Sequence, residues 1–390
     1  MSCLKSQSLI PSPPPQDSKV ITFPSAMAYV PPKFGKGQID AAGRRLATGS
    51  LQEDILENPV SDLVIINNWR SCHSFPLNSF HVTLRGRAIK LDRRAVTAQR
   101  IKRLSSIAAK LARFPRMELS QMQDIGGCRA VVNSAAVVRR LVDVYKKSAG
   151  KNLNRAEFVR EYDYIASPKK DGYRGVHLVY KYRSPAKRHR VYNGLRIEIQ
   201  LRSQLQHTWA TAVETVGTFI GQALKSSQGE EKWLRFFALM STYIAIKERS
   251  PLVEDTPSDA VELRRQLSEY AEQLDAIRHL ELYAAAVDAP ERIGATRGQH
   301  YFLLELDPSQ RKIRITSYKP DELGRASGDY LRIEREILGG STWRDAVLVS
   351  VKSFAALKRA YPNYFLDTHR FIQLVTEALG PKPSPDPTSS

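Results

Sequence analysis

The chain has 390 residues and a formal net charge of +19 at pH 7, and its length is sufficient for two domains, each with its own core. Its three cysteines lie far apart, which excludes a disulfide framework and a cysteine zinc site and leads us to expect a reducing, cytoplasmic setting. No run approaches the ~20 apolar residues of a membrane span, and the first thirty residues lack the apolar stretch of a secretory signal, so no membrane partner is expected.

The positive charge is unevenly placed. Residues 251–390 hold 18 Lys+Arg and 21 Asp+Glu, a balance of −3, so the remaining 41 basic and 19 acidic residues give residues 1–250 a charge of +22. This asymmetry indicates a polyanionic partner for the first part, either nucleotide phosphates, RNA, or both. The alternative is a basic domain whose charges are only solvated.

The N-terminal part is expected to contribute only packing elements, without catalytic or binding residues. Residues 1–33 are rich in Pro and Ser and are predicted to be a disordered leader. Residues 34–84 are predicted to be a helical segment, with one helix over Gln38–Leu56 and another beginning at Ser61. The stretch Ser74–Phe80 is predicted to be a connection that Pro76 interrupts.

A strongly basic stretch follows, with eleven basic residues and one acidic residue between Arg85 and Arg116. The apolar spacing in it predicts a helix over Gln99–Arg113. Four polar side chains of this helix are expected to point together at one anion; they are Arg100, Lys102, Ser106 and Lys110. The alternative is a solvated basic face, but no Glu is interleaved, and like charges four residues apart are unfavourable without an anion.

Two later segments place carboxylates beside apolar strands. Asp124 lies just before a predicted strand at Cys128–Val132, a common place for a metal-binding carboxylate, and a helix is predicted over Ala135–Lys147. Leu195–Ser203 alternates apolar residues with acid, amide and guanidinium groups, so a half-buried strand is predicted. Its polar face presents Glu198, Gln200 and Arg202 together, although a solvated Glu is the ordinary interpretation of such a position. A helix is predicted to begin just after this strand.

Between these segments lies the loop Tyr162–His177. It is predicted to open as a short strand at Tyr164 and Ile165 and to lead into a strand over His177–Arg183. Lys169 and its neighbour Lys170, on a loop bounded by Pro and Gly, form a cationic site suited to phosphate. Tyr173 can stack on a nucleobase. The alternative is a surface hairpin with solvated lysines.

The C-terminal part is predicted to be a smaller α+β module over 251–380, followed by a disordered tail over 381–390. Its predicted elements are a long helix over Ser258–Ala286, a hairpin of Tyr301–Leu306 and Lys312–Tyr318, a helix over Ala326–Ile337, a strand over Ala346–Val351, and helices over Ser353–Ala360 and Asp367–Leu379. This part carries no metal or nucleotide motif, so a regulatory or interaction role is expected for it.

Taken together, four motifs in this order resemble the synthetase domain of RelA/SpoT-type (p)ppGpp synthetases, small alarmone synthetases included. They are RxKxxxSxxxK at 100–110, DIGGCR at 124–129, YIASPKKDGYRGVH at 164–177 and EIQLR at 198–202. The resemblance covers residues 85–250 and implies an α+β, nucleotidyltransferase-like mixed β-sheet flanked by helices. It also implies transfer of the β,γ-pyrophosphate of ATP to the ribose 3′-hydroxyl of GDP or GTP.

The resemblance also assigns roles to individual residues. Arg100, Lys102, Ser106 and Lys110 would hold the ATP phosphates, with Arg129 on the adenine or phosphate side. Asp124 and Glu198 would bind Mg²⁺, and Glu198 would also accept the proton of the 3′-hydroxyl. Around the acceptor nucleotide the resemblance places Tyr173 against the base, and Lys169, His177 and Gln200 at the ribose and phosphates.

Some positions depart from the family pattern. Ser203 stands where Thr is usual, and Arg174-Gly175-Val176 replaces a polar-Ser-Leu sequence, so the acceptor pocket is expected to differ. No His-Asp dipeptide occurs, so a hydrolase domain is not expected. Two alternatives stay open: a toxin-like enzyme that modifies the 3′-end of tRNA, which the +22 charge favours, and a non-enzymatic RNA-binding protein. A homo-oligomer is also considered.

Overall fold

A computed structural model describes residues 30–51, 61–149, 156–219, 231–285, 301–307, 312–339, 345–350 and 368–380. The predicted tail, the predicted leader up to residue 29, and the predicted helix over 353–360 lie outside these ranges. Within them, no helix has the length and apolarity needed to span a membrane.

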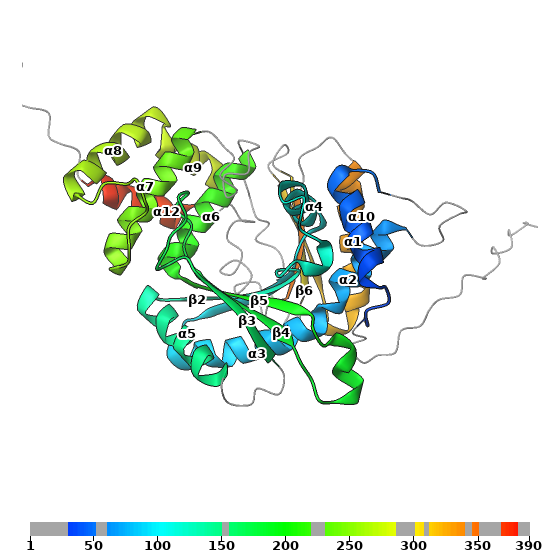
Figure 1. The fold of residues 1–390 in the computed structure, drawn as a ribbon. Helices are drawn as coiled ribbons and strands as arrows, with labels where there is room; N and C mark the ends of the chain where they lie inside the picture. Colours follow the sequence, from blue (N-terminus) through cyan, green and yellow to red (C-terminus); the bar gives the residue numbers. More distant parts are fainter. Residues whose placement is uncertain are drawn as a thin grey trace, which may run out of the picture.

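The centre of the molecule is one mixed sheet, in which eight strands follow the order β3-β4-β5-β2-β1-β8-β6-β7 (Figure 1). The strands are β1 (Val96–Ile101), β2 (Gly126–Val132), β3 (Ala156–Asp163), β4 (Val176–Tyr182), β5 (Arg196–Ser203), β6 (Tyr301–Asp307), β7 (Lys312–Tyr318) and β8 (Asp345–Ser350). Strands β2 and β5 run parallel, and the other neighbouring pairs are antiparallel. The predicted α+β class with a mixed sheet flanked by helices is confirmed.

Two helices, α3 (Ser74–Leu91) and α5 (Ala135–Ala149), cover one face of the β2–β5 region (Figure 1). The apolar residues of β5 alternate with its polar ones, so Ile197, Ile199 and Leu201 all enter the main core. Gly126 leaves little room beside α3 and β5, because a Cβ there would lie 3.3 Å from His73 Cβ and 2.8 Å from the end of the Ile197 side chain. The apolar side chains of β5 therefore pack against α3 and α5, and its alternating polar side chains lie on the opposite face of the sheet.

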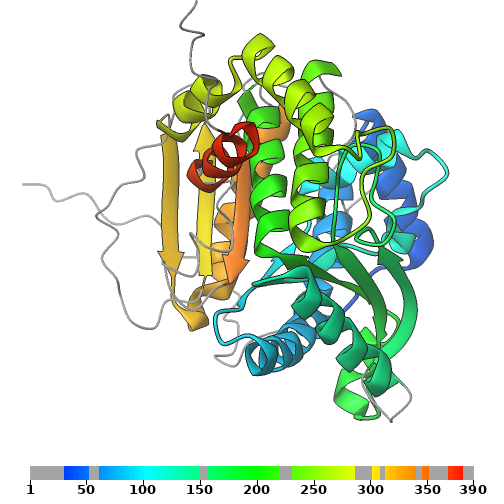
Figure 2. The ribbon, with the colours of Figure 1, turned by 90° about the vertical axis from the view of Figure 1, so that its left-hand side faces the viewer.

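Two groups of helices rise from the other side of the sheet (Figures 1 and 2). One group comprises α1 (Lys36–Thr48), α2 (Asp62–Cys72), α4 (Leu104–Arg113) and α10 (Leu323–Gly339), with the short helices η1 (Leu119–Gln121) and η4 (Pro320–Glu322). The other group comprises α6 (Gln204–Phe219), α7 (Glu231–Glu248), α8 (Ala260–Gln273), α9 (Ala276–Ala285) and α12 (His369–Leu379). A further short helix, η2 (Lys187–Tyr192), connects β4 to β5.

The described elements are continuous across the predicted boundary near residue 250. Strand β8 pairs with β1, so β6, β7 and β8 extend the same sheet instead of forming a second one. Helix α12 packs into the core of α6 and α7, where Phe371 lies 5.7 Å from Phe237 between ring centroids. The core and the sheet thus join the residues on both sides of 250. The predicted domain boundaries at 85, 250 and 380 remain predictions.

The predicted helix over Gln99–Arg113 is wrong in its first part. Gln99 and Arg100 belong to β1, which pairs with β2 on one side and with β8 on the other. Helix α4 begins only at Leu104, so Arg100 and Lys102 do not share a helix face with Ser106 and Lys110. The ladder bonds to two distant strands decide the conformation of residues 99–101, against the local helical spacing.

Three other local predictions are also corrected. Ser74–Phe80 is the start of α3, since Pro76 lies in the first turn, where a backbone N–H has no partner within the helix. The predicted long helix over Ser258–Ala286 is two helices, separated at Asp275, whose φ is +42°. Tyr164 follows a strand rather than starting one, because the Asp163 carboxylate accepts hydrogen bonds from the backbone N–H groups of residues 165 and 166 and turns the chain.

Most of the remaining elements are confirmed. The strands predicted at 128–132, 177–183 and 195–203 correspond to β2, β4 and β5. The predicted C-terminal hairpin is β6 paired with β7, and the helix predicted over 326–337 lies within α10. These segments carry a clear period of two or of 3.6, which is sufficient to assign them from local sequence.

Candidate active site

The polar halves of β1, β2 and β5 meet in a hollow of about 430 Å³, here called the central hollow. It is lined by Ala98, Arg100, Lys102, Asp124, Gly127, Cys128, Arg129, Glu198 and Gln200. Gly127 is paired with Arg100 on one side and with Glu198 on the other, so these two side chains start from the same level of the sheet. Arg129 stands in register with Gln200 one step further. The alternation predicted for β5 therefore does bring the acid and the amide to one surface.

Asp124 is held at the edge of the central hollow by two ammonium groups. Its carboxylate accepts hydrogen bonds from Lys102 Nζ at 2.8 Å and from Lys110 Nζ at 2.9 Å. Burial raises the pKa of Asp124, but the charges of the two lysines outweigh it and hold that pKa well below its usual range. Lys102, just after β1, and Lys110, on α4, thus bind the same carboxylate although they do not lie on one helix face.

Glu198 is the centre of a second network. Its Oε1 lies 3.0 Å from His177 Nδ1, and its Oε2 accepts a hydrogen bond of 2.6 Å from Gln200 Nε2. Burial raises the pKa of Glu198, yet the charge of His177 and the two hydrogen bonds lower it overall. The charge of Asp124, which lines the same hollow, acts on the pKa of Glu198 in the opposite direction.

His177 links Glu198 to Tyr173. The Tyr173 hydroxyl lies 2.6 Å from His177 Nε2 and accepts a hydrogen bond of 2.7 Å from Arg202 Nη2. Burial lowers the pKa of His177, but the oxygens of Tyr173 and Glu198 raise it to about 9. The imidazole is therefore a cation at neutral pH, with both ring nitrogens available as donors.

The loop that carries Tyr173 is fixed by its glycines and by helix α7. Gly172 has a φ of +92°, and a Cβ there would lie 2.9 Å from Ser241 and 3.0 Å from Trp209. The Ser241 hydroxyl donates to the Gly172 carbonyl at 2.6 Å and accepts from Arg174 Nε at 2.9 Å. Gly172 is thus needed both for the turn of this loop and for its close packing against α7.

Lys169 lies above the aromatic part of this loop. Its Nζ is 4.9 Å from the ring centroid of Tyr164 and 5.2 Å from that of Tyr173. Lys170, in contrast, points to the acidic residues Glu254 and Asp255, at 3.3 and 3.9 Å. Of the two loop lysines, only Lys169 belongs to the site.

The structure therefore brings together nearly all the residues that the motifs single out. Arg100, Lys102, Asp124, Arg129, Glu198 and Gln200 line the central hollow, while Lys110, His177, Tyr173 and Lys169 adjoin it through the contacts above. Ser106 lies half-buried on α4, one turn before Lys110. The roles of these residues remain predictions.

Two members of the site receive no role from the sequence. Arg202 bonds the Tyr173 hydroxyl, and the ring of Tyr164 lies edge-on to both Tyr173 and His177, with centroids 5.6 and 5.4 Å away. The alternation of β5 already puts Arg202 on the polar face and is a signal for it. Nothing in the sequence predicts the position of Tyr164, since it depends on the turn at Asp163.

The central hollow is chemically suited to Mg²⁺ together with phosphates. Over the described ranges, no cluster of three His, Cys, Asp or Glu side chains forms a complete metal cage. Two carboxylates, Asp124 and Glu198, do face the hollow. Mg²⁺ is usually bound by one or two carboxylates plus substrate phosphates, so this donor set fits the ion when a nucleotide is present.

Known proteins match the part of the chain that carries this hollow. Residues 99–216 match the model of the region found in RelA/SpoT proteins, which confirms the resemblance over that part of the chain. The chain is 33% identical over 119 residues to the GTP pyrophosphokinase YjbM of Bacillus subtilis (strain 168), an alignment that covers 29% of this chain and 51% of that protein. The chain thus spans about half the length of this curated relative.

Solved structures that align with part of this chain include two small alarmone synthetases from Bacillus subtilis. Small alarmone synthetase 1, bound to its product pppGpp, is 23% identical, with 46% of this chain and 93% of that chain covered and a TM-score of 0.38. Small alarmone synthetase 2 is 19% identical, with 47% and 94% covered and a TM-score of 0.39.

Proposed function

We propose that this chain is a pyrophosphotransferase that moves the β,γ-pyrophosphate of ATP to the 3′-hydroxyl of GDP or GTP. The observation that carries the proposal is that two carboxylates line one hollow. Asp124 is hydrogen-bonded by lysine, and Glu198 is hydrogen-bonded to His177. This pair lies within the residues that match the RelA/SpoT region, and the curated relative is a GTP pyrophosphokinase.

The donor side would be formed by the cations around Asp124. Lys102 and Lys110 each donate one hydrogen bond to Asp124. The remaining N–H groups of the same ammonium ions would donate to phosphate oxygens. Arg100 joins them from β1, Ser106 from α4, and Arg129 from β2 on the adenine or phosphate side. These groups would orient the triphosphate and stabilise the charge that develops on its oxygens during transfer.

The acceptor side would be formed around Glu198. As an ionised carboxylate it would accept the proton of the 3′-hydroxyl, while His177 and Gln200 fix its orientation through the hydrogen bonds described above. Tyr173 would lie against the guanine base, with Lys169 close to the ribose and phosphates. The 3′-oxygen then bonds to the β-phosphorus as the bond between that phosphorus and the α,β-bridging oxygen breaks, so AMP leaves.

Asp124 and Glu198 would hold Mg²⁺, which supplies charge neutralisation for the phosphate oxygens when it is bound. We also propose a reducing, cytoplasmic setting, since the two cysteines within the described ranges, Cys72 and Cys128, are buried free thiols.

The test is an incubation of the full chain with γ-labelled ATP, Mg²⁺ and one acceptor at a time, namely GDP, GTP or deacylated tRNA. The expected result is label in a guanosine product together with one AMP per product, formed about 100-fold or more slowly by the Glu198→Gln variant. Formation of ADP in place of AMP would contradict pyrophosphate transfer. Label in tRNA alone would reject the guanosine acceptor and support the tRNA alternative.

A further inference from the structure

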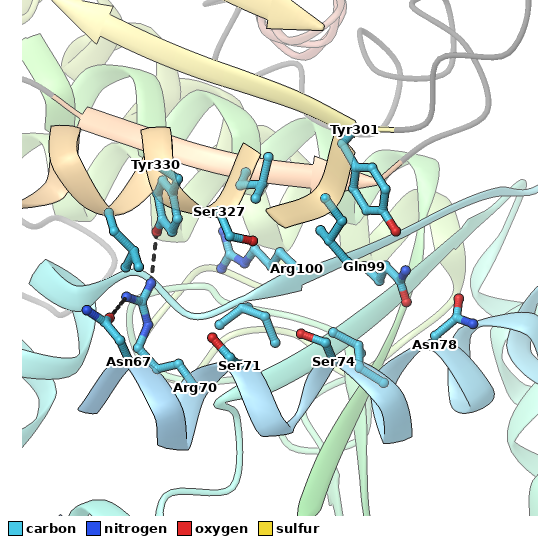
Figure 3. A pocket seen from close by; sticks show the side chains of 15 residues that line it. Asn67, Arg70, Ser71, Ser74, Asn78, Gln99, Arg100, Tyr301, Ser327 and Tyr330 are labelled. Atoms are coloured by element: carbon cyan, nitrogen blue, oxygen red, sulfur yellow. Dashed lines mark hydrogen bonds between the residues drawn. The ribbon is translucent and has the colours of Figure 1, made fainter. Parts of the chain in front are cut away.

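A second and larger hollow lies behind β1, between the N-terminal helices and the C-terminal elements. Its volume is about 790 Å³, including the part that is open to solvent. Its lower wall in Figure 3 is formed by α2 and α3, and its upper wall by α10, with Tyr301 of β6 at one end. We call it the rear pocket. Nothing in the proposed reaction uses it.

The walls of the rear pocket are mostly apolar. Five aliphatic residues line it, namely Leu77, Ile101, Leu323, Leu331 and Leu348. Neutral hydrogen-bonding groups are set between them, such as Ser71 and Ser74 on one wall and Ser327 opposite (Figure 3). A ligand would therefore need an apolar body with a few polar groups.

The charges of the lining residues specify the ligand further. The lining includes two arginines and no acidic side chain. The guanidinium of Arg70 is already neutralised, since its Nη1 lies 2.7 Å from the carboxylate of Glu334 and both side chains are almost fully buried. Arg100 forms no ion pair with an acidic side chain among the described residues, so of the two lining cations it is the one whose charge is not already paired.

Arg100 also lines the central hollow, and it is the residue that the two cavities have in common. We propose that the rear pocket is an effector site for a small, mostly apolar molecule with one anionic group. Such a ligand would draw the guanidinium of Arg100 away from the central hollow and weaken ATP binding. The second half of this inference rests on the proposed function, because it takes Arg100 as a ligand of the ATP phosphates.

The end wall of the rear pocket is bonded directly to the chain that follows Arg100. Arg70 Nε donates to the carbonyl of Lys102 at 3.0 Å, and Glu334 accepts from the backbone N–H of Leu104 at 2.7 Å. The hydroxyl of Tyr330 completes the network, with bonds of 3.0 Å to Arg70 and 2.6 Å to Glu334. A ligand that moves Arg70 or Tyr330 would therefore also act on the backbone of Lys102 and on the start of α4.

The test uses 8-anilinonaphthalene-1-sulfonate as the probe, because it is a mostly apolar fluorescent molecule with one anionic group. Titration of the full chain is expected to show one saturable site, with at least about 10-fold tighter binding than that of the neutral analogue N-phenyl-1-naphthylamine. Ser327→Trp, which fills the pocket from α10, should weaken probe binding at least about 10-fold. Arg335→Trp, on the exposed side of the same helix, should leave it unchanged.

A second variant on the opposite wall, Ser71→Phe, provides the same test if Ser327→Trp does not fold, and circular dichroism checks each variant. Non-saturable fluorescence, or binding that survives both pocket-filling variants, would overturn the site, since this probe also marks loosely packed apolar surface. Equal affinity for the neutral analogue would overturn the role of Arg100.

The coupling is tested by repeating the titration with saturating α,β-methylene-ATP. Because coupling between sites is reciprocal, the nucleotide should weaken probe binding by at least about fivefold. A chain that makes no (p)ppGpp but binds the probe as described would reject the proposed function and leave the pocket standing. Probe binding that is indifferent to the nucleotide would overturn the coupling.

Discussion

The carboxylate of Glu334 lies 2.7 Å from the backbone N–H of Leu104, 230 residues earlier in the sequence. Leu104 begins α4, whose N-cap residue Arg103 provides no side-chain cap. A carboxylate at the start of a helix satisfies a free N–H group and interacts favourably with the helix dipole. The helix that carries Ser106 and Lys110 is therefore capped by a residue from the C-terminal part of the chain.

This relationship predicts a stability effect for Glu334→Ala. The substitution leaves the guanidinium of Arg70 buried without its carboxylate partner, so the free energy of unfolding should fall by about 3–5 kcal/mol. Urea unfolding followed by circular dichroism measures the change. The matched control is Glu336→Ala on the same helix, because its ion pair with Arg332 is exposed and should contribute less than about 1 kcal/mol. Equal losses in the two variants would show that Glu334 is not a structural link.

A second prediction concerns the proposed base. Glu198→Gln should lower the rate of transfer by about 100-fold or more, because an amide cannot accept the proton of the 3′-hydroxyl. The variant should remain folded, since the amide oxygen of the new Gln can accept from His177 and the Gln200 amide can turn so that its oxygen accepts from the new NH2 group. Product formation under saturating ATP and GDP measures the effect, with Glu157→Gln on the exposed part of β3 as the control. A variant with near-normal turnover would remove Glu198 from the mechanism.

Much of the central hollow can be predicted from the sequence because its signals are local. The period of two in β5 places Glu198 and Gln200 on one face, and the glycines after Asp124 lead directly into β2. The position of Arg100 could not be predicted in this way. The spacing of Ile101, Leu104 and Leu111 suits a helix, and only the pairing of β1 with β2 and β8 makes residues 99–101 a strand.

The rear pocket and the cap of α4 cannot be predicted from the sequence either, for a different physical reason. Both depend on contacts between residues 70–104 and residues 301–348, and no local pattern encodes a contact over such a separation. Glu334 in the sequence is one of several acidic residues on an amphipathic helix, and such a residue is ordinarily solvated. Its burial follows only from the docking of α10 beside α2 and α4.

A third prediction separates the two roles of Tyr173. Tyr173→Ala should weaken acceptor binding by about 1–3 kcal/mol through loss of stacking, with little change in the KM for ATP. Tyr173→Phe keeps the ring but removes the hydroxyl that joins His177 to Arg202, so it should retain most of the acceptor affinity. The KM values for GDP and ATP measure both effects. An equal rise of both KM values in Tyr173→Ala would show that Tyr173 does not belong to the acceptor side alone.

The last prediction is a pH dependence of stability that His177 causes. Its pKa is raised from 6.5 to about 9 in the folded chain, because the oxygens of Tyr173 and Glu198 outweigh burial. A raised pKa means that the stabilisation is complete below about pH 6.5 and is lost as the pH rises through about 9. The difference in unfolding free energy between the wild type and His177→Gln should therefore shrink by as much as about 3 kcal/mol between pH 6.5 and pH 10.

Urea unfolding at each pH measures this difference. His73→Gln is the control, since burial lowers the pKa of His73 to about 4 and leaves it neutral throughout the same window. Its offset from the wild type should therefore change by less than about 0.5 kcal/mol across the window, because only the unfolded form of His73 takes up protons near pH 6.5. If the His177→Gln profile also ran parallel to that of the wild type, His177 would not be the cation that holds Glu198 in its ionised form. The support that we propose for the catalytic base would then have to come from Gln200 alone.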